Sequence, residues 1–376
     1  MYSFQKIIIG LLGLVILSSC EKPYDIDEPL PDHLTASIFV VNNNNTVLAI
    51  DPETGDKKWE TKIKNGAKAT PIIYGGKLIV TDLGGILYQI NRIDGKIEDE
   101  VPLGGPVSGT PVMIDDKMAI PIGNDVRLVD ASNRFNFIWQ YSATAPINTS
   151  LSQGKIPGND TLQILFVSGD NVYALNFETG IVTWKKAIAG AGTFNSSALV
   201  VDEKFIYAGN DNGKLYSFNI KDGSINWAYQ TGAEIYSSPI SVGGNILVGS
   251  NDRYLYSVDS ATGNLRWKSQ VGDRVMSSPF VYDQEVFFGS NDKNLYSVNI
   301  IDGTLKWKKL TFGTVIGSPM AYKNIVYFTS HDNNLYALNT KTGAQKWVIN
   351  TGGYITSSPI FDDLDVVISP ATSRIK

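Results

Sequence analysis

Short apolar runs of three to six residues recur along most of the chain, separated by turns rich in glycine, asparagine and aspartate. The stretch from Ser277 to Trp307 is typical, with runs at 279–281, 286–289, 295–298 and 305–307. These runs are rich in β-branched and aromatic residues and are too short for helices, so they predict strands. The intervening Asn-Asp and Asp-Gly pairs predict tight turns. Each unit is therefore expected to form four short antiparallel strands.

The units repeat along the chain with a nearly constant period. Each unit except one ends in a tryptophan: Trp59, Trp139, Trp184, Trp227, Trp267, Trp307 and Trp347. Asp99, in the degenerate copy 94–99, fills the remaining gap, which gives eight units spaced by 40, 40, 45, 43, 40, 40 and 40 residues. This period is typical of propeller blades. We predict an all-β fold, an eight-bladed β-propeller of four-stranded antiparallel blades over residues 35–376.

The two ends of the repeat region are out of phase with each other. The chain enters the repeats at 38–41, in the position of a second strand, and 357–360 resembles a first strand without its partners. We expect the last segment to complete the blade that the first segment begins, which would leave no open edge there. Residues 366–368 are a further apolar run, and they compete for the place of 38–41.

The segment before each tryptophan resembles the docking motif of PQQ-type propellers, Ala-x-Asp-x-x-Thr-Gly-x-x-x-Trp. The motif is found at 49–59 and recurs at 174–184, 257–267 and 337–347. Its glycine permits the positive φ of a tight turn. The resemblance implies that each indole packs between adjacent blades and that its N–H meets a backbone acceptor. We therefore interpret as structural both the tryptophans and the recurring tyrosines Tyr88, Tyr173, Tyr216, Tyr256, Tyr296 and Tyr336.

The N-terminal region predicts export and lipidation. Lys6 precedes an apolar run at 7–17, which suits a signal peptide over residues 1–19 and is short for a membrane span. Leu17-Ser18-Ser19-Cys20 resembles the lipobox of bacterial lipoproteins, which makes Cys20 the expected acylation site; the alternative is a signal peptide with an incidental cysteine. Residues 20–34 are acidic and contain prolines, so they predict an extended tether.

Composition excludes several classes of partner and site. The formal net charge is −5 and no segment carries a basic stripe, which argues against nucleic acid and against an anionic membrane surface as partners. Cys20 is the single cysteine, so the folded part is expected to lack disulfides. His33 and His331 have no metal ligands at suitable spacing, and we predict no metal site.

PQQ-dependent dehydrogenases share the predicted fold, so an enzyme is the main alternative. The resemblance implies that many of them stack the quinone on a disulfide between adjacent cysteines, and that some add a Cys-x-x-Cys-His haem site. This chain cannot supply those cysteines. It also has no Gly-x-Ser-x-Gly elbow, phosphate loop or His-Glu-x-x-His motif. A carboxylate pair for glycoside hydrolysis drawn from different blades would leave no sequence signature. We predict a non-enzymatic protein without a cofactor, PQQ included.

Two sets of positions are candidates for binding. Residues three and five positions before each first-strand proline are expected to ring the mouth of the central channel, and they include Lys68, Glu234, Tyr236, Arg274 and Tyr354. They could hold a small polar ligand, although similar loop tips are usually only solvated. The other set comprises insertions at 154–161 and 187–193, in a region that also carries Asp99 and Phe135 at motif positions. Insertions in repeat proteins tend to mark a binding face, so a protein partner is expected there.

A lipid-anchored, non-catalytic eight-bladed propeller of this kind resembles the BamB family of outer-membrane β-barrel assembly lipoproteins. The resemblance implies an interaction scaffold held at the outer membrane by its lipid, on the periplasmic face or at the cell surface. No motif in this sequence matches the family's partner-binding residues. Two alternatives remain, a glycan-binding surface lipoprotein and a degenerate PQQ-dependent oxidoreductase.

Overall fold

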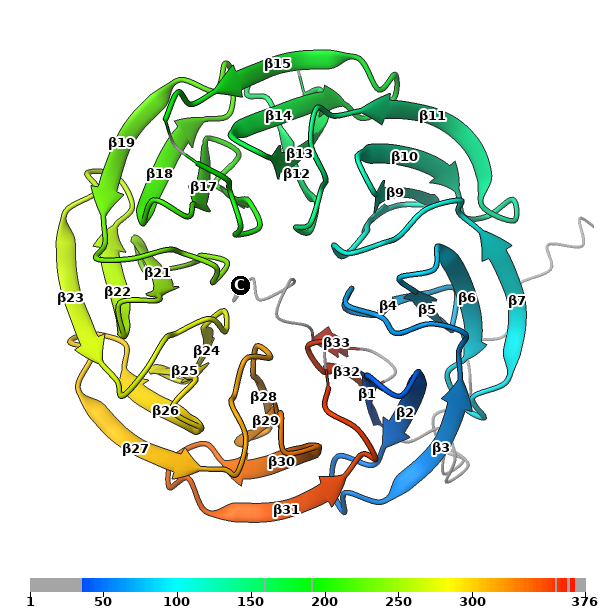
Figure 1. Ribbon diagram of the computed structural model, residues 1–376, viewed down its shortest axis with the longest axis vertical. Coiled ribbons are helices and arrows are strands. Elements are labelled where there is room, and N and C mark those ends of the chain that lie inside the picture. The colour runs from blue at the N-terminus through cyan, green and yellow to red at the C-terminus, as the bar shows by residue number, and fades with distance from the viewer. Residues whose placement is uncertain (1–35, 159, 191, 356, 364–365, 369–376) are drawn as a thin grey trace, which may run out of the picture.

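The computed structural model describes residues 36–158, 160–190, 192–355, 357–363 and 366–368. These residues form eight antiparallel sheets arranged radially around a central axis, seven with four strands and one with five (Figure 1). The predicted all-β, eight-bladed propeller is confirmed. Within each blade the strands are named A to D from the axis outward. The predicted signal peptide, Cys20, His33 and the tether 20–34 lie outside the described residues.

Blades 1 to 4 contain the following strands in the order A to D. Blade 1 has β32 (Ile360–Asp363), β1 (Ser37–Asn42), β2 (Thr46–Ile50) and β3 (Lys57–Lys62), with β33 (Val366–Ile368) as an additional strand. Blade 2 has β4 (Ile72–Tyr74), β5 (Lys77–Thr81), β6 (Ile86–Asn91) and β7 (Ile97–Pro102). Blade 3 has β8 (Val112–Ile114), β9 (Lys117–Ile122), β10 (Asp125–Asp130) and β11 (Asn136–Ser142). Blade 4 has β12 (Ser152–Lys155), β13 (Leu162–Ser168), β14 (Asn171–Asn176) and β15 (Val182–Ala187).

Blades 5 to 8 follow the same order with more uniform lengths. Blade 5 has β16 (Leu199–Val201), β17 (Phe205–Gly209), β18 (Lys214–Asn219) and β19 (Ile225–Gln230). Blade 6 has β20 (Ile240–Val242), β21 (Asn245–Ser250), β22 (Tyr254–Asp259) and β23 (Leu265–Gln270). Blade 7 has β24 (Phe280–Tyr282), β25 (Glu285–Gly289), β26 (Asn294–Asn299) and β27 (Leu305–Leu310). Blade 8 has β28 (Met320–Tyr322), β29 (Ile325–Ser330), β30 (Asn334–Asn339) and β31 (Gln345–Asn350).

The core lies between the blades, because B and C strands are covered on both faces by their neighbours. Every residue of β1 and β2 is buried, whereas the D strand β3 keeps a single buried residue, Trp59. Apolar clusters accordingly join adjacent blades; one contains Val41 of blade 1 and Leu78 of blade 2. Burial on both faces explains why the B and C runs read as continuous apolar segments rather than as alternating ones.

Each tryptophan docks its own blade onto the next one. The indole nitrogens donate to main-chain carbonyls of the neighbouring C–D turns at 2.7–3.1 Å, in the pairs Trp59–Arg92, Trp139–Phe177, Trp184–Ile220, Trp227–Ser260, Trp267–Ile300, Trp307–Thr340 and Trp347–Pro52. The motif glycine of that turn lies directly against the indole. A Cβ on Gly303, for example, would lie 2.4 Å from Cε3 of Trp267.

The tyrosines of the C strands are also structural. In blades 6, 7 and 8 the phenol donates to a B–C turn carboxylate, in the pairs Tyr256–Asp252, Tyr296–Asp292 and Tyr336–Asp332 at 2.5–2.7 Å. The same carboxylates accept a main-chain N–H from the loop that enters the blade from the preceding one, as Asp292 does from Gly272 at 2.8 Å. Each pair therefore fastens a B–C turn to the preceding connecting loop, and burial raises the pKa of Tyr336 to about 12.

The ring is closed by strands from both ends of the chain. β1 pairs with β32 in the register Ser37↔Asp362, Ile38↔Phe361 and Phe39↔Ile360. The expectation that 366–368 competes for the place of 38–41 is wrong, because β33 pairs with the other edge of β32, on the axis side (Figure 1). The closure is reinforced by an ion pair between Arg92 Nη1 of blade 2 and Asp362 Oδ2 at 2.7 Å.

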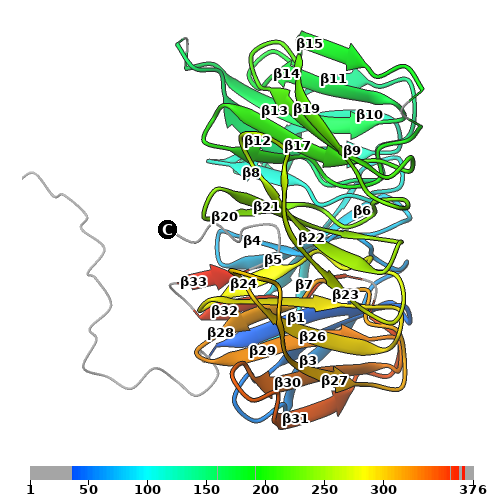
Figure 2. The ribbon, with the colours of Figure 1, turned by 90° about the vertical axis from the view of Figure 1, so that its left-hand side faces the viewer.

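Antiparallel order gives the propeller two distinct faces. The A–B face carries the A–B and C–D turns, and the B–C face carries the B–C turns and the loops that connect successive blades (Figure 2). The hairpin between β12 and β13 is longer than its counterparts and projects from the A–B face in Figure 2.

Candidate functional site

The predicted channel-mouth residues lie on loops of the B–C face. The carbonyls of Glu234, Arg274 and Tyr354 each accept a main-chain N–H from a B–C turn, all at 2.9 Å. Glu234 and Arg274 stand on successive loops. Hydrogen bonds from its own main chain and from Asn251, together with the charge of Arg274, lower the pKa of Glu234. The loops therefore hold these positions in equivalent places around the ring.

The five mouth residues do not form one cluster. The ring of Tyr354 lies 5.0 Å from that of His331, tilted by 46°, and burial lowers the pKa of His331. Among the described residues, Lys68 and Tyr236 make no hydrogen bond, ion pair or ring contact to the other mouth residues. Tyr236 and Tyr354 are each 40% exposed. The arrangement is a set of separate polar side chains at a rim.

The two insertions lie on opposite faces of the propeller. Residues 156–158 and 160–161 belong to the A–B loop between β12 and β13, in which the Ile156 N–H donates to the Thr161 carbonyl at 3.1 Å. In the second insertion, Ala187 ends β15, and 188–190 and 192–193 belong to the loop that leaves blade 4 on the B–C face. Ile188 and Phe194 donate main-chain N–H groups to the B–C turn at 169–170. A flat partner could cover only one of the two insertions.

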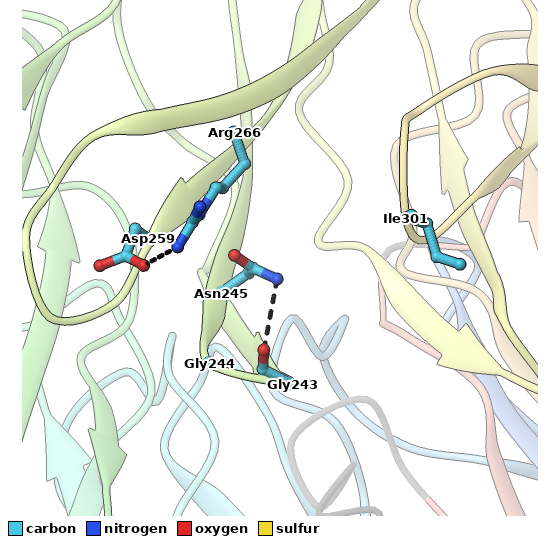
Figure 3. A pocket seen from close by; sticks show the side chains of 6 residues that line it. All are labelled: Gly243, Gly244, Asn245, Asp259, Arg266 and Ile301. Carbon is cyan, nitrogen blue, oxygen red and sulfur yellow. Dashed lines mark hydrogen bonds and ion pairs between the residues drawn. The ribbon is translucent and has the colours of Figure 1, made fainter.

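The A–B face also carries grooves between neighbouring blades. One groove of about 430 Å³ lies between blades 6 and 7 (Figure 3). Arg266 and Asp259 form a 2.5 Å ion pair on one side, and Ile301 of the next C–D turn faces them. Hydrogen bonds from Thr262 and then from Arg266 lower the pKa of Asp259 to about 2. Neither Trp267 nor its acceptor Ile300 is among the residues that line this groove.

The junction between blades 2 and 3 is different because it lacks a tryptophan. Asp99 stands in the indole position, and the opposing C–D turn carries Arg134 and Phe135 with φ of +49° and +56°. Phe135 is 5% exposed and joins the apolar cluster of this junction with Ile79 of blade 2. It therefore fills from blade 3 part of the space that an indole fills elsewhere.

A polar cleft of about 540 Å³ remains above Phe135, and we call it the Asp99 cleft. It is lined by Tyr74, Gly75, Lys77, Gln89, Glu98 and Asp99 of blade 2 and by Ala131, Ser132 and Arg134 of blade 3. Asp99 and Phe135 depart from the repeat motif in the sequence, but a cavity between them was not predicted. The missing tryptophan was the signal that could have located it.

Within the described part of the chain, no three His, Cys, Asp or Glu side chains come together in a way that could hold a metal ion. Within the same residues, no helix has the length and apolarity needed to cross a bilayer.

A family model described as outer membrane protein assembly factor BamB matches residues 35–269 and 230–369. This chain belongs to the BamB family. Relatives include the BamB proteins of Yersinia pestis, 23% identical over 219 residues, and of Moranella endobia (strain PCIT), 24% identical over 208 residues. Each match covers 52% of this chain, and they cover 55% and 51% of the two relatives. The chain thus spans about half the length of the curated BamB relatives it matches.

Solved structures agree with the BamB assignment at the level of fold. BamB from Moraxella catarrhalis superposes with a TM-score of 0.68 at 15% identity, covering 81% of this chain and 96% of that one. A quinohemoprotein alcohol dehydrogenase from Pseudomonas putida HK5 superposes with a TM-score of 0.64 at 13% identity, covering 84% and 70%. The fold is therefore shared by BamB proteins and by enzymes.

Proposed function

We propose that this chain is a non-catalytic, lipid-anchored scaffold that binds a protein partner during the assembly of outer-membrane β-barrel proteins. Membership of the BamB family is the observation that carries the proposal. The anchor would be Cys20, which would hold the propeller on the periplasmic face of the outer membrane. The enzymatic alternative is disfavoured because Cys20 is the single cysteine and every tryptophan is engaged in docking a blade.

The A–B face offers the more distinctive surface for such a partner. It carries the projecting β12–β13 hairpin and the Asp99 cleft, whereas the mouth residues on the B–C face are dispersed around a rim. In the more regular blades the A–B turn contains only two residues, such as Gly243 and Gly244 between β20 and β21. The hairpin at 156–161 can therefore be shortened without disturbing strand register.

The test is affinity purification of the tagged, lipidated protein after crosslinking in its own envelope, followed by mass spectrometry. Recovery of a barrel-assembly subunit is expected. Recovery of glycan-utilisation proteins alone would contradict the proposal and favour a glycan-binding surface lipoprotein.

A matched variant locates the surface. Replacing 156–161 with Gly-Gly retains the Lys155↔Leu162 pair and should abolish recovery of the partner while leaving the melting temperature nearly unchanged. The Gly243-Gly244 turn of blade 6, which lies outside both the hairpin and the Asp99 cleft, serves as the control when exchanged for Asn-Gly and should retain the partner. Undiminished recovery with the shortened hairpin would place the contact elsewhere.

A further inference from the structure

The Asp99 cleft occupies the position that an indole fills at the other junctions. At those junctions an indole N–H donates to a main-chain carbonyl at the start of the next C–D turn; the indole of Trp267, for example, reaches Ile300, the first residue after β26. Ala131 is the corresponding residue of blade 3 and lines the cleft. The chain itself supplies no indole here, because position 99 is an aspartate. The junction therefore retains the acceptor side of a docking site without its usual donor.

The groove at the junction of blades 6 and 7 provides an internal comparison. Both cavities lie between an A–B turn and the next C–D turn, but the one above Trp267 is bounded by Asn245, Asp259 and Arg266. The Asp99 cleft is lined in addition by Gln89, Asp99 and Ala131, whose counterparts at the other junction do not line its groove. Replacement of the tryptophan has thus opened a recess with a carboxylate at its inner end.

Asp99 has spare capacity to accept hydrogen bonds. Its Oδ1 accepts the Glu100 N–H at 2.9 Å, but Oδ2 has only long neighbours, with Gln89 Nε2 at 3.4 Å and Arg134 Nη2 at 3.6 Å. The Arg134 side chain is 82% exposed, so it approaches from solvent and is weakly held. Lys77 is already paired with Glu98 at 2.9 Å.

We propose that the Asp99 cleft binds a guanidinium group, the side chain of an arginine presented by a partner protein. A guanidinium is planar and carries several N–H donors, so it can bond to the Asp99 carboxylate and to a main-chain carbonyl in the same recess. Arg134 already approaches Oδ2 from the rim and is the group that the incoming arginine displaces. The proposal takes a protein partner from the proposed function, but the cleft itself can be tested without one.

The direct test is a titration of the full-length propeller with N-acetyl-L-arginine amide, followed by TROSY NMR. We expect shifts at the amides of Gly75, Ala131 and Ser132 with a dissociation constant of about 1–10 mM, as for a single charge-assisted contact. The neutral isostere N-acetyl-L-citrulline amide should bind at least ~10-fold more weakly. Equal affinity for the two probes would overturn the proposal.

Three variants and one control predict whether the affinity for the probe falls, rises or stays the same. Asp99→Asn should lower the affinity for the arginine probe by ~10-fold. Glu100→Gln changes the next residue of the strand, which lies outside the cleft lining, and should leave that affinity unchanged. Arg134→Ala should tighten binding because it removes the competing cation, whereas an anion-binding cleft would lose affinity. The double variant Asp99→Trp/Phe135→Gly restores the motif and should close the cleft to the probe. Tighter binding in Asp99→Asn, or looser binding in Arg134→Ala, would contradict the assignment.

A last comparison distinguishes the source of the guanidinium. If the natural ligand is a protein side chain, free L-arginine, with its charged termini, should bind no more tightly than the blocked amide. A preference of ~10-fold or more for free arginine would overturn the assignment of the guanidinium to a partner protein. Failure of the envelope purification to recover a barrel-assembly subunit would leave these titrations unaffected, so the two proposals can fail separately.

Discussion

The indole nitrogen of Trp347 lies 3.0 Å from the carbonyl oxygen of Pro52, and this hydrogen bond docks the last blade onto the first. The same carbonyl accepts the phenol of Tyr327 at 3.2 Å, so two side chains of blade 8 converge on one C–D turn of blade 1. Ring closure therefore uses the same contact as the other tryptophan junctions, between segments at opposite ends of the chain.

Replacing Trp347 with alanine should cost about 3–5 kcal/mol in the free energy of unfolding, because a buried indole and its hydrogen bond are both lost. Urea denaturation followed by circular dichroism measures this. Phe137→Ala is the control, since Phe137 is 62% exposed and its removal should change stability by less than about 0.5 kcal/mol. Equal losses in the two variants would show that Trp347 does not hold the blades together.

A pair of glycines separates backbone strain from steric contact with an indole. Gly303 and Gly244 both have positive φ, at +70° and +77°, but only Gly303 lies against Trp267, and a Cβ on Gly244 would meet open space. Gly244→Ala should cost about 1 kcal/mol from conformation alone. Gly303→Ala should cost about 1–3 kcal/mol more, because the indole must move. A similar cost at both positions, measured in urea, would contradict the docking account.

The Arg92–Asp362 ion pair should give a pH-dependent stability. Burial raises the pKa of Asp362 and the charge of Arg92 opposes that rise, while Oδ1 of Asp362 is buried without a hydrogen-bond partner among the described residues. The stability linked to this carboxyl is present below its unfolded pKa of about 3.9 and is lost as the pH rises through the raised folded pKa.

Arg92→Met removes the charge that opposes the rise in the pKa of Asp362. The free energy of unfolding of the variant should therefore be lower than that of the unmutated chain by about 3 kcal/mol near pH 7, and by less than half of that near pH 4. Thermal denaturation at the two pH values measures it. Arg266→Met is the matched control, because the Arg266 side chain is 59% exposed and its ion pair should contribute little to stability. A loss independent of pH would mean that Asp362 is not the group responsible.

Two truncations test the roles of the final strands. A chain that ends at Ser358 lacks β32, leaves the inner edge of β1 unpaired and removes Asp362, so it should aggregate or lose its cooperative unfolding transition. A chain that ends at Asp363 lacks β33 but keeps the closed ring, and its melting temperature should fall by only a few degrees. Size-exclusion chromatography and calorimetry compare them. Similar behaviour of the two chains would contradict closure by β32.

The sequence predicted the blade architecture well because the same local chemistry recurs in each unit. Glycine at positive φ and tryptophan four residues later define a turn and a contact that do not depend on distant parts of the chain, as Gly263 and Trp267 illustrate. The place of β33 was predicted wrongly because alignment to the repeat can assign a segment only to one of the four strand positions of a blade. It cannot reveal an additional strand beyond those four.

The Asp99 cleft could not be predicted from motif positions alone. Its depth depends on how far Phe135 of one blade fills the space left by Asp99 of another, and that is a property of packing between two segments. The opposite placement of the insertions follows from strand order, and it becomes evident once 156–161 is assigned to an A–B turn and 187–193 to a connection between blades.

The pairing of β1 with β32 also sets the order of events during biosynthesis. The remaining blades are built from strands adjacent in sequence, so each can form soon after its own residues emerge, whereas β1 must wait for a partner more than 300 residues later, at Ile360–Asp363. Such a long-range contact is slow to form because a large loop has to close first. Until then the nascent chain exposes one hydrogen-bonding edge. A chaperone that shields this chain would therefore act most usefully on its first three strands.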